Sequence, residues 1–440
     1  MTDPRSSAPN DAAGAVGLRS ESAALSLNEI AGGKFDEKLL EKSSWKDPLF
    51  EWVLSNPWRV MWVARFLRLL LKLPGLPWSI VWRYDDVREV LSKDAQFPVA
   101  WGERMIEVTR GRNFVLGMQH DNAYRLSYQE LAKAFPLAEV PRRVEQPAAD
   151  LAEGILRSKA AEGGELDAVQ DLITAVPTRL CDSYFGIAIP DDVQFAKWTL
   201  ATSAYVFGTS SKASDKALGN AAAAHLRETI RSSIALAKKL PRKDTVLKHM
   251  LEMGLDDDTI HAQFFGMILG YIPTNVLAGG NILETLLRRP EFLERARAAA
   301  LADDDPLLWR CLREALRFRH INPGPWRICP LGYTVGEGGP SPTRIRPGRK
   351  VLAPIQTAMF DPDRVEDPYA FNPLRSDDNY MVFGFGQHWC VGFSIARATA
   401  TQTFKPLLKL KRLRAVRTLR AQAKRFNGFY PLHLDVGFEP

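Results

Sequence analysis

The most informative segment of the chain is the loop Phe383-Gly384-Phe385-Gly386-Gln387-His388-Trp389-Cys390-Val391-Gly392. Its glycines carry no side-chain bulk, so the backbone beside the cysteine can approach a flat partner closely. Its aromatic residues can keep water away from the sulfur of Cys390. From about Val391 the sequence becomes helical, through Ala396. This pattern predicts that Cys390 lies at a helix N-terminus, where the helix dipole favours an ionised thiolate.

On its chemistry alone, the cysteine has two open interpretations. A lone cysteine in a glycine-rich loop is most often a buried, inert thiol, whereas a thiolate held in this way can also bind the iron of a flat macrocycle. The spacing Phe-x-x-Gly-x-x-x-Cys-x-Gly is formed by Phe383, Gly386, Cys390 and Gly392. It resembles the haem-binding signature of the cytochrome P-450 family, and Ala396 stands where that signature extends.

The resemblance implies a mainly α cytochrome P-450 fold, in which a helix-rich body carries a small β-rich part. It also implies heme b (iron protoporphyrin IX) as the cofactor and Cys390 as the metal ligand. A thiolate ligand pushes electron density onto iron and favours cleavage of the O–O bond. Further residues of the segment are then expected at the cofactor: Phe383, Gly384, Gly392 and Ala396.

Charged residues elsewhere match other parts of the family pattern. Haem carries two propionates that need cationic or hydrogen-bonding partners, and Arg327 and His388 stand at the matching places. Glu314 and Arg317 form the Glu-x-x-Arg pair of the family, which Arg375 is expected to complete. Three charges stay buried only when they pair with one another, so this cluster is expected to be structural.

A third candidate for the propionates, the region 118–125, matches less well. The family usually has a histidine and an arginine four residues apart there, whereas an alignment without gaps puts Ala123 and Ser127 on these two places. His120 or Arg125 can substitute for them. The alternative is that both are exposed polar residues on a helix.

The segment from about Phe264 to Leu287 resembles the long helix that crosses the haem in this family. That helix usually carries an acid followed by a threonine, which organise the water that delivers protons to bound dioxygen. Here Thr274 keeps the alcohol, but Pro273 holds the acidic position and offers neither a side-chain proton nor an N–H. Thr274 and Asn275 are the expected catalytic residues. Pro273 either kinks a continuous helix or ends one helix and starts another.

Three functions stay open at this point. In the first, Thr274 and ordered water, with Asn275, suffice for proton delivery, and oxygen from dioxygen enters a C–H bond of an apolar small molecule. In the second, the altered helix serves a peroxide- or hydroperoxide-using enzyme of the same fold. In the third, the chain is a non-catalytic haem binder. Turnover with an electron-transfer system, with peroxide, or with neither distinguishes them.

The rest of the chain is consistent with one domain. Residues 1–30, rich in Ala, Ser, Gly and Asn, predict a flexible tail, and residues 31–440 a single domain. Helices are expected over 148–159, 166–185, 193–206, 217–240 and 257–289 because apolar residues recur there at three- and four-residue steps. After Pro323 short strands are expected, at 332–335 and 350–353, among glycines and prolines.

The scattered cysteines, Cys181, Cys311, Cys329 and Cys390, indicate neither a zinc site nor a disulfide framework and fit a reducing, cytoplasmic location. No secretory signal begins the chain. The apolar stretch Trp58–Trp78 is interrupted by basic residues and prolines, so it is not expected to span a membrane. It predicts either a first core helix or a basic amphipathic surface in weak contact with a membrane.

The partners are predicted from what the chain lacks. No flavin or nicotinamide module fits beside the oxygenase, so electrons must come from another protein, such as a ferredoxin or flavodoxin. A late basic run between Lys405 and Arg425 is either a solvated face or a docking face for an acidic donor, and without a recognition motif it does not indicate nucleic acid. Arg104, Arg110 and Arg112 are solvated loop residues or anchors for an acid group on the substrate.

Overall fold

A computed structural model of the chain describes residues 35–41, 47–66, 78–119, 121–208, 210, 212–240, 242–417, 419 and 425–439. The predicted tail over 1–30 and the candidate His120 lie outside these residues.

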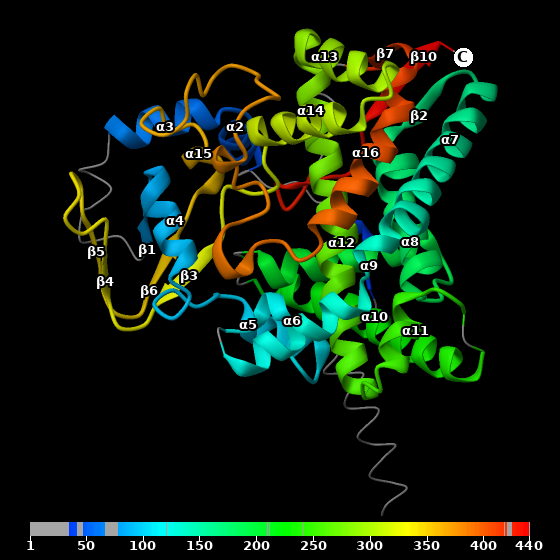
Figure 1. The fold of residues 1–440 in the computed structure, drawn as a ribbon, viewed down its shortest axis with the longest axis horizontal. Helices are drawn as coiled ribbons and strands as arrows, with labels where there is room; N and C mark the ends of the chain where they lie inside the picture. Colours follow the sequence, from blue (N-terminus) through cyan, green and yellow to red (C-terminus); the bar gives the residue numbers. More distant parts are fainter. Residues whose placement is uncertain are drawn as a thin grey trace, which may run out of the picture.

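Helices make up most of the fold (Figure 1). They are α2 (Asp47–Ser55), α3 (Pro57–Phe66), α4 (Tyr84–Ser92), α5 (Gly102–Thr109), α6 (Asn122–Ala134), α7 (Gln146–Ala161), α8 (Ala175–Leu180), α9 (Asp192–Phe207), α10 (Ala213–Lys239), α11 (Val246–Glu252), α12 (Asp257–Leu287), α13 (Pro290–Leu301), α14 (Asp305–Phe318), α15 (Ile355–Ala358) and α16 (Phe393–Lys409). Short 3-10 and π segments connect them: η1 (Glu37–Leu39), η3 (Val115–Gly117), η4 (Leu137–Glu139), η5 (Pro141–Glu145), η6 (Ala168–Thr174), η7 (Cys181–Phe185), η8 (Asp377–Asn379) and η9 (Gly386–His388).

The strands are short: β1 (Trp78–Ile80), β2 (Glu165–Asp167), β3 (Trp326–Cys329), β4 (Tyr333–Val335), β5 (Thr343–Ile345), β6 (Arg349–Leu352), β7 (Lys411–Ala415), β8 (Arg425–Phe426), β9 (Tyr430–Pro431) and β10 (Asp435–Glu439). One sheet has the order β1-β6-β3 and another the order β2-β10-β7, while β4-β5 and β8-β9 are two-stranded. In the first sheet β1 runs parallel to β6, with Trp78 opposite Lys350.

Helix α12 lies at the centre of the molecule, with α16 beside it (Figure 1). Residues on all sides of α12 are buried, as expected for a helix that is apolar around most of its circumference. The hydroxyl of Tyr271 on α12 lies 2.7 Å from that of Thr399 on α16. This bond ties the central helix to the helix that follows the cysteine loop.

Most of the predicted elements are confirmed, one needs correction, and one of the two alternatives for Pro273 is confirmed. The helices expected over 148–159, 193–206, 217–240 and 257–289 are α7, α9, α10 and α12, and the expected strands are β4 and β6. The helix expected over 166–185 is wrong at its start, because Glu165–Asp167 forms β2 and pairs with β10 near the C-terminus. Pro273 does not divide a helix in two, since α12 continues through it.

Candidate active site

The cysteine loop, residues 383–392, is shaped by its own backbone hydrogen bonds. The amide of Cys390 donates to the carbonyl of Phe383 at 2.9 Å, and the amide of Gly384 donates to the carbonyl of Met381 at 2.9 Å. Gly384 and Gly386 adopt φ angles of 81° and 72°, a left-handed conformation that disfavours other residues. The loop therefore returns on itself and holds the cysteine in one place.

Gly386 also has a packing role against α4. A Cβ atom there would lie 2.3 Å from the carbonyl oxygen of Leu91, which is closer than any contact a side chain can make. The loop is held on this side by Arg88 of α4, whose guanidinium lies 4.2 Å from the centre of the Phe385 ring. The cysteine loop thus packs directly on helix α4.

Cys390 is partly buried, just ahead of α16. Burial raises the pKa of the thiol to about 11, and the hydrogen bond from the amide of Gly392 opposes this rise without cancelling it. The amide at the helix N-terminus therefore favours the thiolate, as expected from its position, while burial favours the neutral thiol. A metal cation bound to the sulfur would deprotonate it outright.

Aromatic rings surround the loop on the side of α16. The ring of Phe383 meets that of Phe393 edge-on with their centres 5.0 Å apart, and the ring of Trp389 lies 5.1 Å from that of Phe393. Ala396 is one turn into α16, where its amide donates to the carbonyl of Gly392 at 2.9 Å. The expected shielding of the sulfur by aromatic side chains fits this packing.

The helix α6 reaches the loop through a tyrosine that the sequence analysis missed. The hydroxyl of Tyr124 donates to the carbonyl of Gln387 at 2.9 Å, and its ring lies 5.5 Å from the His388 ring. Arg125 is exposed and bonds Asn122 instead. The repeat of Tyr124, Tyr128 and Leu131 at helical spacing could have indicated the inward face, because Arg125 is turned about 100° away from it.

Arg327 is, after Tyr124, the second polar side chain described near the candidate site. It is buried, its terminal nitrogen donates to the carbonyl of Trp326 at 3.2 Å, and its Nε has no hydrogen-bond partner among the described residues. Burial lowers the pKa of Arg327 to about 10, although the charge of Asp94 opposes this change. Within the cysteine loop, the Nε2 of Gln387 is also buried without a partner.

The two expected catalytic residues are together on α12, but their donors are in use. The hydroxyl of Thr274 donates to the backbone carbonyl of Gly270 and lies 3.3 Å from the backbone carbonyl of Tyr271. The Nδ2 of Asn275 donates to the same Tyr271 carbonyl at 2.8 Å. Pro273 donates no hydrogen bond to Leu269. The threonine oxygen keeps lone pairs that can accept a proton donor such as water.

The Glu-Arg-Arg cluster is confirmed. Glu314 and Arg317 are fully buried and joined by two hydrogen bonds of 2.8 and 3.0 Å, and the Nε of Arg375 lies 3.6 Å from Glu314. Tyr380 donates to Glu314 at 2.6 Å. Burial raises the pKa of Glu314, but the hydrogen bond and charge of Arg317 outweigh it and hold this pKa below its ordinary range.

Several cations of the late basic run pair with neighbouring acids, which fits its interpretation as a solvated face. Lys405 binds Asp303 and Asp305, Lys409 binds Asp303, and Arg412 binds Glu439, all within 3.1 Å. Lys405 and Lys409 lie near the C-terminal end of α16 and Arg412 follows on β7, whereas Cys390 precedes the N-terminal end of the same helix. Arg425 is buried.

Two of the arginines near the expected pocket also have structural partners. Arg104 donates to the carbonyls of Tyr205 and Gly208 at 2.8 and 2.7 Å, so it caps the end of α9. Arg112 pairs with Asp256 at the surface. Neither is available to anchor an acid group of a substrate.

A helical body around one long central helix, with a glycine-bounded cysteine ahead of a second helix, defines a haem protein of the oxygenase class. The family model described as Cytochrome P450 matches residues 69–414, and the chain belongs to this family. It is a monooxygenase with haem as its cofactor, and the mainly α fold predicted from the sequence is confirmed.

Relatives and solved structures agree with this assignment. The chain is 26% identical to cytochrome P450 107B1 of Saccharopolyspora erythraea, over 74% of this chain and 80% of that protein. It is 24% identical to vitamin D(3) 25-hydroxylase of Pseudonocardia autotrophica, over 74% and 79% of the two chains. The structure of P450BioI in complex with acyl carrier protein ligated to hexadec-9Z-enoic acid matches with a TM-score of 0.72 at 19% identity, covering 89% and 100% of the two chains.

The residues present fit a haem. Its two carboxylates need donors, and Arg327 and Gln387 each hold a buried nitrogen that has no hydrogen-bond partner in the described part of the chain. At Gly392 a Cβ would lie 3.8 Å from the sulfur of Cys390, so the glycine leaves room beside the cysteine. In the described residues no helix is long and apolar enough to cross a membrane.

Proposed function

We propose that the chain uses dioxygen to hydroxylate or otherwise oxidise an apolar small molecule, with Cys390 as the ligand of the haem iron. The observation that carries this proposal is the constrained position of Cys390, whose amide is fixed by Phe383 and whose sulfur lies beside Gly392. When bound, the haem supplies the redox centre at which dioxygen is activated. The chain's own residues hold that cofactor and control the access of protons and water.

Arg327 is proposed to bind a propionate, because its guanidinium is buried and its Nε has no hydrogen-bond partner among the described residues, so a negatively charged ligand group would stabilise it. Gln387 adds a neutral donor from the cysteine loop. His388 is held at this rim by Tyr124 and is proposed to assist. Phe383, Gly384, Gly392 and Ala396 shape the surface around the sulfur.

Thr274 is proposed to hold a water molecule that moves protons to the reacting oxygen. Its hydroxyl donates to Gly270, so its oxygen accepts from that water. Asn275 presents a carbonyl oxygen because its amino group is bound to Tyr271. Since Pro273 replaces the usual acid, proton delivery depends on water and Thr274 alone.

That same proline supports a second candidate function, a peroxide- or hydroperoxide-using enzyme. Such an enzyme needs no delivery of protons to dioxygen, so an acid at position 273 is dispensable. Turnover with hydrogen peroxide and none with an electron-transfer system would select this candidate. Failure with both oxidants over a broad substrate panel would leave a haem-binding role.

An apolar substrate is supported by the side of α12 that faces η3. Phe114 packs on Gly266, where a Cβ would clash with its ring, and Leu116 lies 3.6 Å from the Cβ position of Gly270. Relatives named vitamin D(3) 25-hydroxylase and steroid C26-monooxygenase act on lipophilic molecules. We expect this chain to bind a molecule of comparable apolar character.

Electrons are proposed to enter from a separate ferredoxin or flavodoxin beside the cysteine loop. Trp389, adjacent to Cys390, is 44% exposed. Arg125 on α6 and Arg397 on α16 are exposed cations on the two helices that flank the loop. Charge reversal at Arg125 and Arg397 is expected to slow reduction at low salt, while reversal at Arg412, which pairs with Glu439, leaves it unchanged.

The ligand assignment is tested by the absorption spectrum of the reduced, carbon monoxide-bound protein. Wild type is expected to show the shifted band of thiolate-ligated haem, and Cys390→Ala to lose it. Cys329→Ala, at a buried cysteine on β3, is the matched control and should keep the band. An unchanged spectrum in Cys390→Ala would refute the assignment.

The oxidant is tested with Thr274→Ala and its matched variant Thr274→Ser. With dioxygen, NAD(P)H and a ferredoxin system, Thr274→Ala is expected to consume electrons with about a hundredfold less product, the lower end of the effect of losing one proton-transfer group. Thr274→Ser should retain most of the coupling. Equal coupling in all three proteins would remove Thr274 from the mechanism.

A further inference from the structure

Helix α3 presents an aromatic stripe to solvent. Trp62 and Phe66 are 66% and 75% exposed, and Val63 between them is 38% exposed. Their spacing, with exposed Arg59 one turn earlier, places them on one face of the helix. The Trp62 and Phe66 rings stack with their centres 5.9 Å apart, so the exposed face is a continuous apolar surface.

The neighbouring face of α3, formed by Trp58 and Met61, is firmly packed. Met61 is buried, and the ring of Trp58 lies 6.1 and 6.0 Å from the rings of Phe318 and Phe360. The exposure of Trp62 and Phe66 is therefore not a consequence of a loosely attached helix. Large exposed apolar patches on a well-packed element mark a binding surface.

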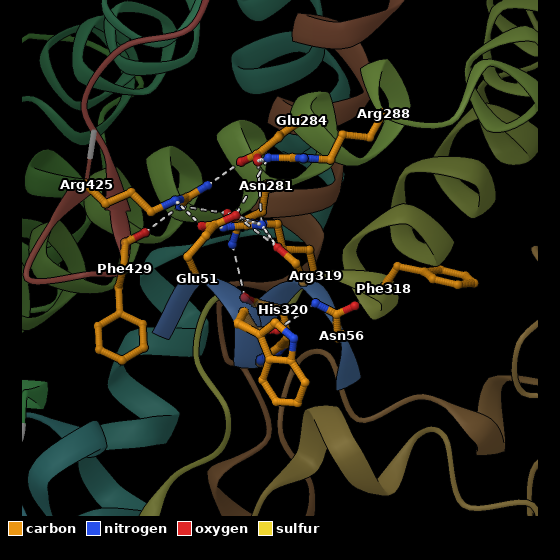
Figure 2. Close-up of polar contacts among 12 residues, drawn as sticks. Glu51, Asn56, Asn281, Glu284, Arg288, Phe318, Arg319, His320, Arg425 and Phe429 are labelled. Atoms are coloured by element: carbon orange, nitrogen blue, oxygen red, sulfur yellow. Dashed lines mark hydrogen bonds and ion pairs between the residues drawn. The ribbon is translucent and has the colours of Figure 1, made fainter. Parts of the chain in front are cut away.

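Helix α2 extends this surface and is fixed to the core by an ion network (Figure 2). Leu49 and Trp52 of α2 are also exposed. On its inner side Glu51 accepts from Arg319 at 2.9 Å and lies 3.4 Å from Arg425. The apolar surface of α2 and α3 is thus held in a set orientation.

The sequence that follows Glu51 is basic. No acidic residue occurs between Glu51 and Asp85, whereas five basic residues do: Arg59, Arg65, Arg68, Lys72 and Arg83. In strand β1, Trp78 pairs with Lys350 of β6. Near it, Arg344 and Arg346 are exposed on and after β5. Figure 1 shows α3 and β5 on the same side of the molecule.

We propose that the surface formed by α2 and α3 docks in the interface of an anionic lipid bilayer. Tryptophan, phenylalanine and leucine facing outward beside arginines are the composition of interfacial helices, in which rings enter the acyl boundary while cations meet the headgroups. Each basic residue near an anionic membrane adds attraction that an acid-free segment does not offset. The docking is peripheral and does not depend on the proposed oxidation.

A bilayer fits this surface better than an acidic protein does. The rings of Trp62 and Phe66 project from the exposed face of α3, and the exposed described cations on this side of the molecule are Arg59 on α3 and Arg344 and Arg346 at β5. A fluid lipid interface accepts such exposed rings without needing a complementary shape. An enzyme docked here could receive a lipophilic substrate from the membrane.

The test uses holoenzyme and sedimented vesicles of phosphatidylcholine alone or mixed equally with phosphatidylglycerol. Wild type is expected to bind the mixed vesicles, and to bind them at least tenfold more tightly than phosphatidylcholine vesicles. The variant Trp62→Ser/Phe66→Ser should lose at least tenfold of this binding. Arg59→Glu should weaken binding to the anionic vesicles selectively.

The matched control is Leu236→Ser/Leu240→Ser, which removes an exposed apolar pair of the same spacing from the end of α10. It should bind vesicles like wild type. The reduced, carbon monoxide-bound spectrum of each variant checks that the fold and haem are intact. Equal vesicle binding by Trp62→Ser/Phe66→Ser and wild type, or no binding by wild type, would overturn the proposal without affecting the proposed oxidation.

Discussion

Glu314 and Glu284 each lie among buried arginines, but the two clusters connect different parts of the molecule. Glu314 binds Arg317 from its own helix and lies 3.6 Å from Arg375 on the segment that leads to the cysteine loop. Glu284 on α12 binds Arg288 one turn later and Arg425 on β8, and it lies 3.6 Å from Arg319.

Their exposure differs as well. Both members of the Glu314–Arg317 pair are inaccessible to solvent. The second cluster reaches the surface through Glu51 and Arg288, whose side chains are 28% and 34% exposed (Figure 2). When one partner of the first cluster is lost, water cannot solvate the remaining charge. In the second cluster, water can reach the charges at the exposed edge. Burial, rather than the number of ion pairs, should determine how much each cluster contributes to the free energy of unfolding.

The largest effect is expected from Arg317→Met. This change keeps an unbranched apolar stem but leaves Glu314 without its closest cationic partner and the carbonyls of Met359 and Pro368 without their Arg317 donor. Loss of one partner of a buried ion pair costs about 3–5 kcal/mol. Urea unfolding should show this loss, or the variant should fail to accumulate in folded form. A cost below that of Glu51→Gln would reverse the ranking of the two clusters.

The second cluster should respond less and should depend on pH. Burial raises the pKa of Glu51, but the hydrogen bond and charge of Arg319 and the charge of Arg425 outweigh it and hold this pKa at about 2. A lowered pKa stabilises the fold above its ordinary value of 4.5, and this contribution disappears as the pH falls toward 2. Glu51→Gln is expected to cost about 2 kcal/mol at neutral pH, between a surface pair and a buried one.

The measurement is the urea midpoint between pH 7 and pH 3. The difference between wild type and Glu51→Gln should shrink as the pH falls through this range. Glu252→Gln, at an exposed acid on α11, controls for the loss of one charge. A difference that stays constant with pH would show that Glu51 stabilises by packing instead.

Removing one hydrogen bond from the first cluster should have a smaller effect. Tyr380→Phe deletes the hydroxyl that donates to Glu314 at 2.6 Å and leaves the ion pair intact. A hydrogen bond to a charged group contributes about 1.5–3 kcal/mol, and we expect the lower end because Arg317 still neutralises the acid. Tyr369→Phe, at an exposed tyrosine, is the matched control. Equal urea midpoints for the two variants would contradict this estimate.

The two clusters also differ in how far the sequence predicts them. Glu314 and Arg317 are three residues apart, so one turn of helix brings them together. Glu284 and Arg425 are 141 residues apart, and Glu51 and Arg319 are 268 apart. No local pattern relates them, because their contact depends on how α2, α12 and β8 meet in the folded chain.

The same distinction explains the candidate site. The cysteine loop and the threonine of α12 follow from local spacing. The sequence predicts Arg125 at the propionates because charge is expected there, but helix register turns Arg125 outward. The strand β2 was read as helix because its partner β10 lies at the other end of the chain. The sequence does not predict which segments far apart in the chain pair with one another.

The late basic run gives the smallest expected effect. Lys409 was a candidate for partner docking, but it lies 2.6 Å from Asp303, and both side chains are exposed. Water screens such a pair, and an exposed pair contributes little to stability. Lys409→Ala should therefore leave the urea midpoint unchanged within error, at low salt and at high salt. Because Lys405 also binds Asp303 at 3.1 Å, the acid keeps a partner after the change. A measurable, salt-dependent decrease in the urea midpoint would mean that this surface network stabilises the fold more than its exposure predicts. Burial would then not explain the difference between the buried and exposed ion pairs.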